Sequence, residues 1–196
     1  MATKTKQELK DVFNGLSSVL YTDEVVDLSS GTPTITPKYD LPVTVDTLQL
    51  SQDDPTVNHY KVIGLDGDWT SSATLGDMAV QFTVPTKAKE VLQLAYGESA
   101  VKDITKLTLT TGDAEVDNSA KGYEGVSLMI GKKKVTGTFV LVDEEKKNLM
   151  VITNIALWAK PLYENPGTEP FAIQFTGTIE GAGSQSLAWL KKKTTE

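Results

Sequence analysis

Alternating apolar and polar positions recur along most of the chain, and they predict a protein built mainly from β-strands. The clearest alternation lies in residues 171–181, where Phe171, Ile173, Phe175 and Ile179 share one face and polar side chains share the other. One face of this strand is therefore expected to pack on a core. Similar patterns predict further strands at residues 43–50, 57–65, 78–84, 104–110, 123–130, 135–142 and 149–159.

The residues after Pro85 follow a helical period instead. One helical face collects the apolar side chains of Ala88, Val91, Leu92 and Ala95. Thr86 stands where an N-cap is expected, and Gly97 stands where a helix commonly ends. The pattern predicts one flanking α-helix at about residues 86–96, set between two groups of strands.

The N-terminal segment, residues 1–20, permits two interpretations. Apolar side chains at the i, i+3, i+4, i+7 spacing predict a short helix over residues 6–16, formed by Leu9, Val12, Phe13 and Leu16. The same segment could instead be an arm that becomes ordered only on a neighbouring subunit, because terminal segments are often loose until something binds them. The sequence does not decide between these alternatives.

The whole chain, residues 1–196, is expected to form a single domain, since no repeat or low-complexity linker divides it. Proline, threonine and glycine in residues 22–42 predict an extended loop. Residues 43–181 would form the β core, and the tail at residues 182–196 could add an edge strand or dock on a neighbour. Many strands with one helix indicate an antiparallel β-sandwich or barrel.

Composition narrows the classes of protein to which the chain can belong. It contains no cysteine, which excludes disulfides, thiolate metal sites and cysteine nucleophiles. All 19 basic residues are lysine, so the chain has no guanidinium group to bind phosphate or a base edge in bidentate fashion. With 26 acidic residues the net charge is −7, and we expect nucleic acid to be repelled from most of the surface.

Neither a membrane partner nor secretion is indicated. The longest apolar run, residues 149–159, is too short to span a bilayer. The lysines near the N-terminus are not followed by a continuous apolar stretch of the signal-peptide type. We therefore expect the protein to stay in the cytoplasm in which it is made.

Candidate chemistry is sparse. His59 is the only histidine, and no G-x-S-x-G motif provides a nucleophile for it, so a structural or surface role is expected. Asp66, Asp68 and Asp77, with Asp53 and Asp54 nearby, are the candidates for a hard-cation site or a glycosidase carboxylate pair. Their spacing does not fit an EF-hand loop, and aspartates beside glycines also form turns. We predict no catalytic residue, no cofactor and no metal site.

Lysines occur in clusters at residues 132–134, 146–147 and 191–193. Lysine at a turn is usually solvated and also discourages pairing between sheet edges. The alternative is contact with acidic patches on copies of the same protein, which this acidic chain would supply.

Taken in order, these features resemble the major tail tube proteins of tailed bacteriophages, whose fold is similar to the tube protein of type VI secretion systems. The features that carry the resemblance are the acidic β-rich chain of about this length and the N-terminal segment that orders late. They also include the proline-bearing loop at residues 29–42, the central helix at residues 86–95 and the closing strand PFAIQFTGTIEG at residues 170–181. The resemblance covers most of the chain at the level of layout rather than of a motif.

The resemblance implies a structural subunit that forms hexameric rings, stacked into a tube through which DNA passes without specific binding. Other tail proteins would be partners, and the protein would move from the host cytoplasm into the virion tail. An acidic lumen is expected to keep DNA from adhering. Two alternatives stay open: a β-sandwich module that binds carbohydrate or another ligand, and a hydrolase that uses Asp66 or Asp68.

Overall fold

The structure is a computed structural model that describes residues 13, 15–64, 66–86, 88–110, 112, 122–181 and 185–193. It confirms a mostly β protein with antiparallel ladders, and the described residues contain one α-helix. In chain order the elements are β1 Ser18–Thr22, β2 Tyr39–Leu41, η1 Val45–Thr47, β3 Gln49–Gln52, β4 Thr56–Tyr60, β5 Thr70–Thr74, β6 Met78–Val84, α1 Lys89–Tyr96, η2 Glu98–Ala100, β7 Val101–Leu107, β8 Tyr123–Leu128, β9 Val135–Val142, β10 Asn148–Leu162, β11 Ala172–Ile179 and β12 Leu187–Lys191.

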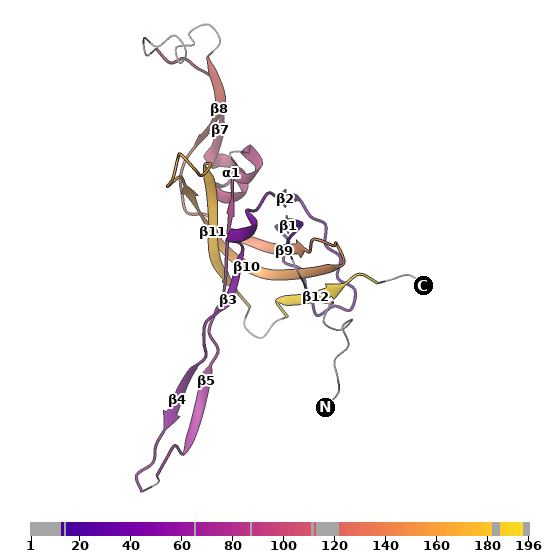
Figure 1. The fold of residues 1–196 in the computed structure, drawn as a ribbon, viewed down its shortest axis with the longest axis vertical. Coiled ribbons are helices and arrows are strands. Elements are labelled where there is room, and N and C mark those ends of the chain that lie inside the picture. The colour runs from indigo at the N-terminus through magenta and orange to yellow at the C-terminus, as the bar shows by residue number, and fades with distance from the viewer. Residues whose placement is uncertain are drawn as a thin grey trace.

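Most of the strands form one antiparallel sheet in the order β2-β1-β9-β10-β11-β6-β3, and β12 pairs with β10. The hairpins β4–β5 and β7–β8 form separate two-stranded sheets. Figure 1 shows these hairpins extending from opposite ends of a central body that holds the large sheet and α1. The ladders establish the antiparallel sheet, while its arrangement as a sandwich or barrel stays a prediction.

A β-bulge in β10 changes the neighbours of that strand halfway along its length. Before the bulge, β10 lies between β12 and β9 and pairs with both strands. After the bulge, β10 pairs with β9 on one side and with β11 on the other. Thr153 and Asn154 lie together opposite Thr138, and Asn154 has a φ of 55°. Such a bulge bends a strand and increases its twist. The bend lets a single 15-residue strand serve both halves of the sheet.

Two buried hydroxyl groups link this bulge to the segment that follows β1. The Oγ1 atoms of Thr138 and Thr153 lie 3.0 Å apart, and Thr138 Oγ1 donates to the Glu24 carbonyl oxygen at 2.8 Å. The backbone N–H of Val26 donates to Thr138 Oγ1 at 3.1 Å. Because an unpaired buried hydroxyl is costly, this network ties the segment after β1 to the bend in β10.

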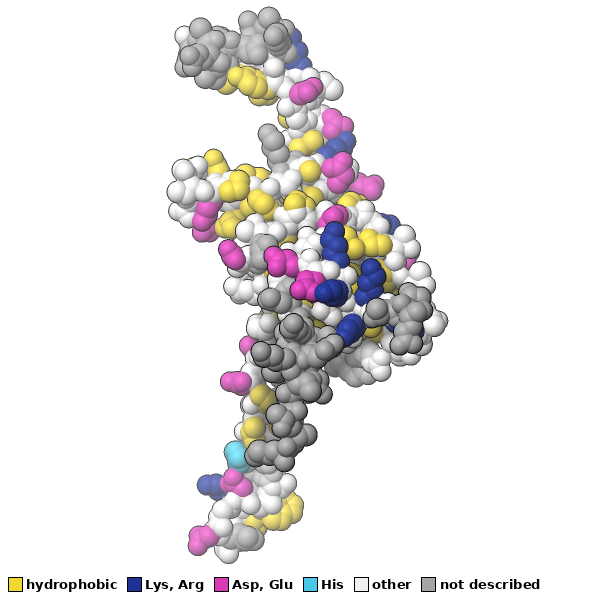
Figure 2. All heavy atoms as spheres, turned by 45° about the vertical axis from the view of Figure 1, so that its right-hand side comes forward, with side chains coloured by type: hydrophobic (Ala, Val, Ile, Leu, Met, Phe, Trp, Pro, Cys, Tyr) yellow, Lys and Arg dark blue, Asp and Glu magenta, His cyan; other side chains and the backbone are white. Residues whose placement is uncertain are grey.

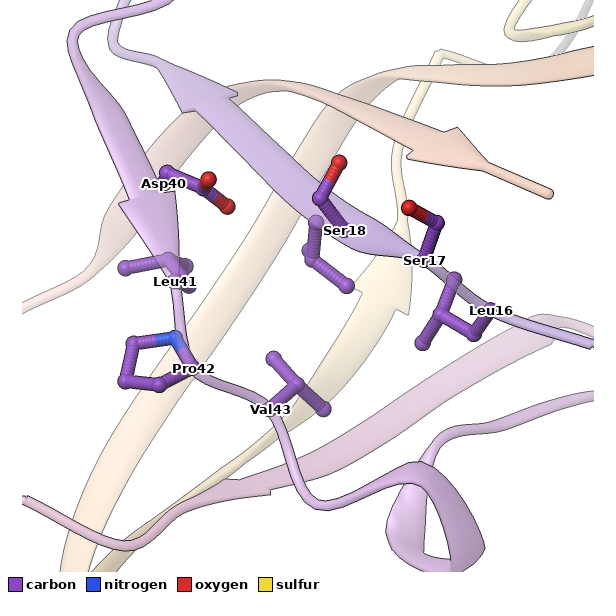
Figure 3. A pocket seen from close by; sticks show the side chains of 8 residues that line it. Leu16, Ser17, Ser18, Asp40, Leu41, Pro42 and Val43 are labelled. Carbon is purple, nitrogen blue, oxygen red and sulfur yellow. The ribbon is translucent and has the colours of Figure 1, made fainter. Parts of the chain in front are cut away.

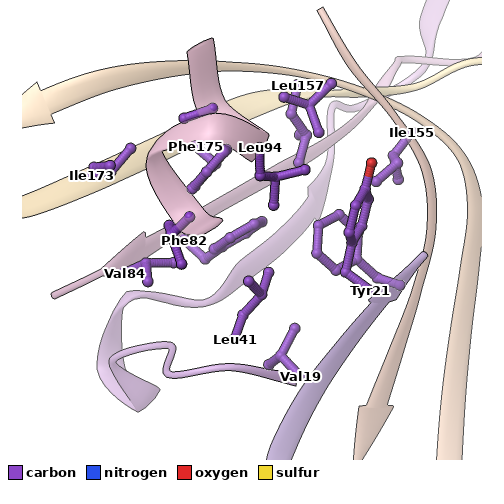
Figure 4. Close-up of a cluster of buried hydrophobic side chains, with 14 of the residues drawn as sticks. Val19, Tyr21, Leu41, Phe82, Val84, Leu94, Ile155, Leu157, Ile173 and Phe175 are labelled. Atoms are coloured by element: carbon purple, nitrogen blue, oxygen red, sulfur yellow. The ribbon is translucent and has the colours of Figure 1, made fainter. Parts of the chain in front are cut away.

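An aromatic cluster lies at the centre of the core between the sheet and α1 (Figure 4). The rings of Phe82 and Phe175 stack with centroids 5.0 Å apart, and Phe82 meets Phe139 edge-on at 5.2 Å. Tyr21 adds a tilted contact with Phe139 at 5.0 Å. Burying aromatic side chains removes a large apolar area from water, so these contacts join β1, β6, β9 and β11 into one core.

Helix α1 closes this core with three of the four apolar side chains predicted for its buried face, whereas the fourth, Ala88, is exposed at the N-cap. Val91, Leu92 and Ala95 are buried there, and Leu94 and Tyr96 join them. Gly97 ends the helix with a φ of 101°, a conformation that favours glycine. Lys133 Nζ donates to the carbonyl oxygens of Gln93 at 3.2 Å and Leu94 at 2.9 Å, which complements the helix C-terminus.

The predicted boundaries are wrong at several places. The helix starts at Lys89 after an Ala88 N-cap, and the Thr86 hydroxyl instead accepts the backbone N–H of Ala88 at 3.0 Å. Residues 18–20, assigned to the N-terminal helix or arm, begin β1, because Val19 and Tyr21 alternate into the core. The loop at residues 22–42 ends in β2, and residues 45–47 form η1 instead of a strand. The predicted helix at residues 6–16 lies mostly outside the described residues.

Strand β11 matches its predicted faces except at one end. Ile173 and Phe175 are buried, whereas Phe171 is 37% exposed and lies before the first residue of the strand. The predicted edge strand in the C-terminal tail is confirmed as β12. None of the helices in the described part of the chain has the length and apolar character needed to cross a bilayer.

Two buried tyrosines provide a matched test of hydrogen bonding in this core. Tyr21 donates its hydroxyl to the Thr136 carbonyl oxygen at 2.7 Å, whereas the buried Tyr96 hydroxyl has no partner in the described structure. Tyr21→Phe should lower the free energy of unfolding by about 1 kcal/mol, and Tyr96→Phe should leave it unchanged or raise it. Urea unfolding measures both changes, and an equal loss in the two variants would contradict this assignment.

Two strand glycines provide a matched test of backbone packing. A Cβ atom at Gly177 in β11 would clash with the carbonyl oxygen of Ala156 in β10, whereas a Cβ atom at Gly125 in β8 would meet nothing within 4 Å. Gly177→Ala should therefore destabilise the fold by about 1–3 kcal/mol. Gly125→Ala should change stability by less than about 0.5 kcal/mol. Thermal unfolding that ranks the variants the other way would refute the close approach of β10 and β11.

Candidate functional site

The structure does not bring the three candidate metal ligands together. Asp66 and Asp68 lie in the loop that joins β4 to β5, whereas Asp77 lies beyond the far end of β5. The backbone N–H of Asp53 donates to the Asp77 carbonyl oxygen at 3.3 Å, which closes the base of the hairpin. Within the described residues, no group of three or more histidine, aspartate and glutamate side chains is placed to hold a metal ion.

His59 and Asp68 do meet, across the hairpin. His59 Nδ1 lies 2.7 Å from Asp68 Oδ2, with the two side chains 55% and 37% exposed. Ser71 is the cross-strand partner of His59. An exposed Asp–His pair of this kind ties the tip of the hairpin to β4. It does not form the buried, oriented set that nucleophilic catalysis needs.

The β4–β5 hairpin extends from the body without a covering layer. All ten residues of its two strands are exposed, although its ladder runs without interruption from Thr56 opposite Thr74 to Tyr60 opposite Thr70. A two-stranded hairpin without a third strand or helix is marginally stable in water. The exposed apolar side chains on and beside it are Val57, Tyr60, Val62, Ile63, Trp69 and Leu75.

The β7–β8 hairpin repeats this feature at the other end of the molecule (Figure 1). Its base contacts α1, but its outer part lies away from the core. The exposed apolar side chains on and beside it are Leu107, Leu109, Tyr123, Met129 and Ile130. Apolar surface concentrated on projecting elements marks sites of interaction between proteins.

A cluster of five lysines lies on the body, where the β9–β10 turn meets the end of β12. We call it the lysine cluster, and it consists of Lys146, Lys147, Lys191, Lys192 and Lys193. The backbone N–H of Lys192 donates to the Lys147 carbonyl oxygen at 2.8 Å, which holds the two segments together. Trp189 and Leu190 on β12 are 61% and 45% exposed beside it. Figure 2 shows lysine side chains gathered on this part of the body.

Asp143 fixes the turn that carries Lys146 and Lys147. The Asp143 carboxylate is buried and accepts the Lys147 backbone N–H at 2.8 Å and the Asn148 side-chain amide at 2.7 Å. Burial alone would raise the pKa of Asp143, but the hydrogen bonds from Asn148, Lys147 and Lys146 outweigh it, so the pKa is lowered. The ionised carboxylate is therefore part of the folded turn.

The lowered pKa of Asp143 predicts a defined pH dependence of stability. A carboxyl group whose pKa is lower in the folded state stabilises the fold above its unfolded pKa of about 3.9. This stabilisation is lost as the pH falls through the folded value. Asp143→Asn should therefore lower the urea midpoint at pH 7, and the gap from wild type should narrow as the pH falls below about 4. The exposed Glu144→Gln is the control, and a gap that is constant across this range would contradict the assignment.

An uncharged polar surface covers the outer side of β3, β6, β11 and the second half of β10. Gln49, Gln81, Thr176 and Trp158 form one cross-strand row over these four strands. Ser51, Gln174 and Thr178 lie on the same side, and Lys160 adds one charge. We call this surface the polar face. These residues include no acidic side chain, whereas the chain as a whole has a net charge of −7.

One pocket of about 400 Å³ lies between β1 and β2 (Figure 3). Its walls are mostly aliphatic, with two serines and a single carboxylate, and they consist of Leu16, Ser17, Ser18, Val19, Asp40, Leu41, Pro42 and Val43. None of these residues is aromatic, so the pocket offers no ring against which a sugar could stack. One carboxylate also does not make the acid and base pair of a glycosidase.

Comparison with known proteins identifies no relative: no family model, no curated protein and no solved structure matches the chain. Function is therefore inferred from the residues and their geometry. The sequence pattern did not predict the β4–β5 hairpin. Its second strand, β5, has the sequence TSSAT, which shows no apolar alternation. The run of exposed apolar residues around Ile63 and Trp69 was the available signal.

Proposed function

We propose that this protein is a structural subunit that assembles with copies of itself into rings, which stack as a tube that conducts DNA. The observation that carries this proposal is the pair of hairpins that project from opposite ends of the body. Large apolar side chains are exposed on or beside both hairpins, among them Ile63 and Trp69 at one and Leu107 and Met129 at the other. A subunit with such surfaces gains buried area by associating with other copies.

The large sheet also favours assembly over an isolated monomer. It ends in the short strands β2 and β3, which present backbone donors and acceptors at its two edges. Association of copies that covers or extends these edges would satisfy those groups. Ring closure in a homo-oligomer is one arrangement that leaves no edge open.

The polar face is our candidate for the wall of the channel. Glutamine and threonine side chains bind water and carry no positive charge to attract a polyanion. Lys160 is the one basic residue among those that define this face. This surface is closer to neutral than the acidic lumen expected from the sequence. The remaining acidic residues, which give the chain its charge of −7, would act on DNA over a longer range.

A ligand-binding module is the alternative function, and the pocket at β1 and β2 is where it would act. Its aliphatic lining suits a small apolar ligand better than a sugar. No second feature of the described structure converges on this pocket. The projecting hairpins have no role in such a module, and the assembly proposal accounts for them.

The proposal predicts concentration-dependent assembly. As the protein concentration rises, the mass measured by light scattering should grow from 21.2 kDa to about six times that value for a hexameric ring or beyond. Negative-stain electron microscopy should then show rings or tubes. A protein that remains monomeric at every accessible concentration, with no rings or tubes, would contradict the proposal.

A further inference from the structure

The β4–β5 hairpin is strongly acidic as well as apolar. Residues 53–77 contain five aspartates and one lysine, a net charge of −4 with His59 neutral. Asp66 and Asp68 flank Gly67 at the tip, next to the exposed side chains of Ile63 and Trp69. The tip therefore combines negative charge with two large apolar groups.

The lysine cluster has the opposite character. Its five lysines are exposed, and the nearby Asp143 is buried in its own hydrogen bonds. Glu145 offsets part of the charge through a 2.6 Å ion pair with Lys147, and Glu144 is also exposed. Trp189 and Leu190 provide apolar surface beside the cluster, with one edge of Trp189 in contact with Phe13 at a centroid distance of 6.3 Å.

We propose that the β4–β5 hairpin of one copy docks on the lysine cluster and β12 of a second copy, an inference that rests on the proposed assembly. Opposite charges would steer the approach, and Trp69 would pack against the apolar side chains of β12. The hairpin cannot make this contact within its own chain, because it points away from the body that carries the cluster (Figures 1 and 2).

This contact joins two different surfaces, so it is head-to-tail. A copy whose hairpin is docked can still receive another hairpin at its lysine cluster. A copy whose lysine cluster is occupied can still dock its own hairpin on a further copy. A head-to-tail contact therefore repeats from copy to copy and generates a closed ring or an open stack. A contact between identical surfaces would stop at a dimer.

Charge reversal on each surface tests this contact. One variant carries Asp53→Lys, Asp54→Lys and Asp66→Lys on the hairpin, which changes the net charge of residues 53–77 from −4 to +2. A second variant carries Lys192→Glu and Lys193→Glu at the cluster. All five residues are exposed, and none belongs to the core. Each variant alone should associate about tenfold more weakly than wild type, because like charges then face each other. Unchanged melting temperatures would show that both variants fold.

Mixing the two variants is the decisive step. The basic hairpin of the first variant matches the acidic cluster of the second, and the acidic hairpin of the second matches the basic cluster of the first. An equimolar mixture should therefore recover association toward the wild-type level, as measured by light scattering. A control with Glu164→Lys and Glu169→Lys, in the β10–β11 loop, adds positive charge away from both surfaces and should associate like wild type.

The outcomes separate this contact from the proposed function. If wild type assembles and both reversed variants assemble equally well, or if the mixture recovers nothing, the hairpin contact is wrong and the assembly proposal stands. If wild type remains a monomer, both proposals fail. Weaker association of wild type in 0.5 M than in 0.05 M sodium chloride would support the charged contact.

Discussion

The bulge in β10 is the constraint on which the rest of this fold depends. One extra residue at Thr153 and Asn154 bends the strand, so its first half pairs with β12 and its second half with β11. The buried Thr138 hydroxyl bonds to the Thr153 hydroxyl at the bend and to the Glu24 carbonyl oxygen in the segment after β1. Because β9 and β11 both pair directly with β10, the bend sets the relative position of the two halves of the sheet that enclose the aromatic core.

This arrangement divides the molecule into a body that holds the buried aromatic core and two hairpins that carry exposed apolar groups. The stacked rings of Phe82 and Phe175 lie inside the body, whereas Ile63 and Trp69 lie exposed on a two-stranded hairpin. A hairpin with no third layer is only marginally stable by itself. Assembly would supply that layer, and its strongest candidate is the lysine cluster of another copy. The proposed function therefore depends on the elements that the body leaves uncovered.

The sequence predicted the strands in which the pattern of apolar and polar residues follows the burial of the side chains. The boundaries of β6 and β9 match the expected ranges, because apolar residues in these strands either alternate with polar ones or follow one another without a break. It missed β5, whose serines and threonines carry no such pattern, and it misplaced Thr86, whose hydroxyl bonds locally before the helix begins. Asp66 and Asp77 are close in sequence, but the β4–β5 hairpin separates them, and no local pattern reports that separation. The projection of the hairpin depends on contacts distant in sequence.

Whether self-association covers the β4–β5 hairpin is best tested by amide hydrogen exchange in β4 and β5, measured below and above the concentration at which the mass rises. We expect rapid exchange of these amides in the dilute monomer and protection in the assembled protein, with β10 and β11 protected in both states. Equally rapid exchange of β4 and β5 after assembly would show that the hairpin stays uncovered. That result would contradict the claim that self-association completes this structure.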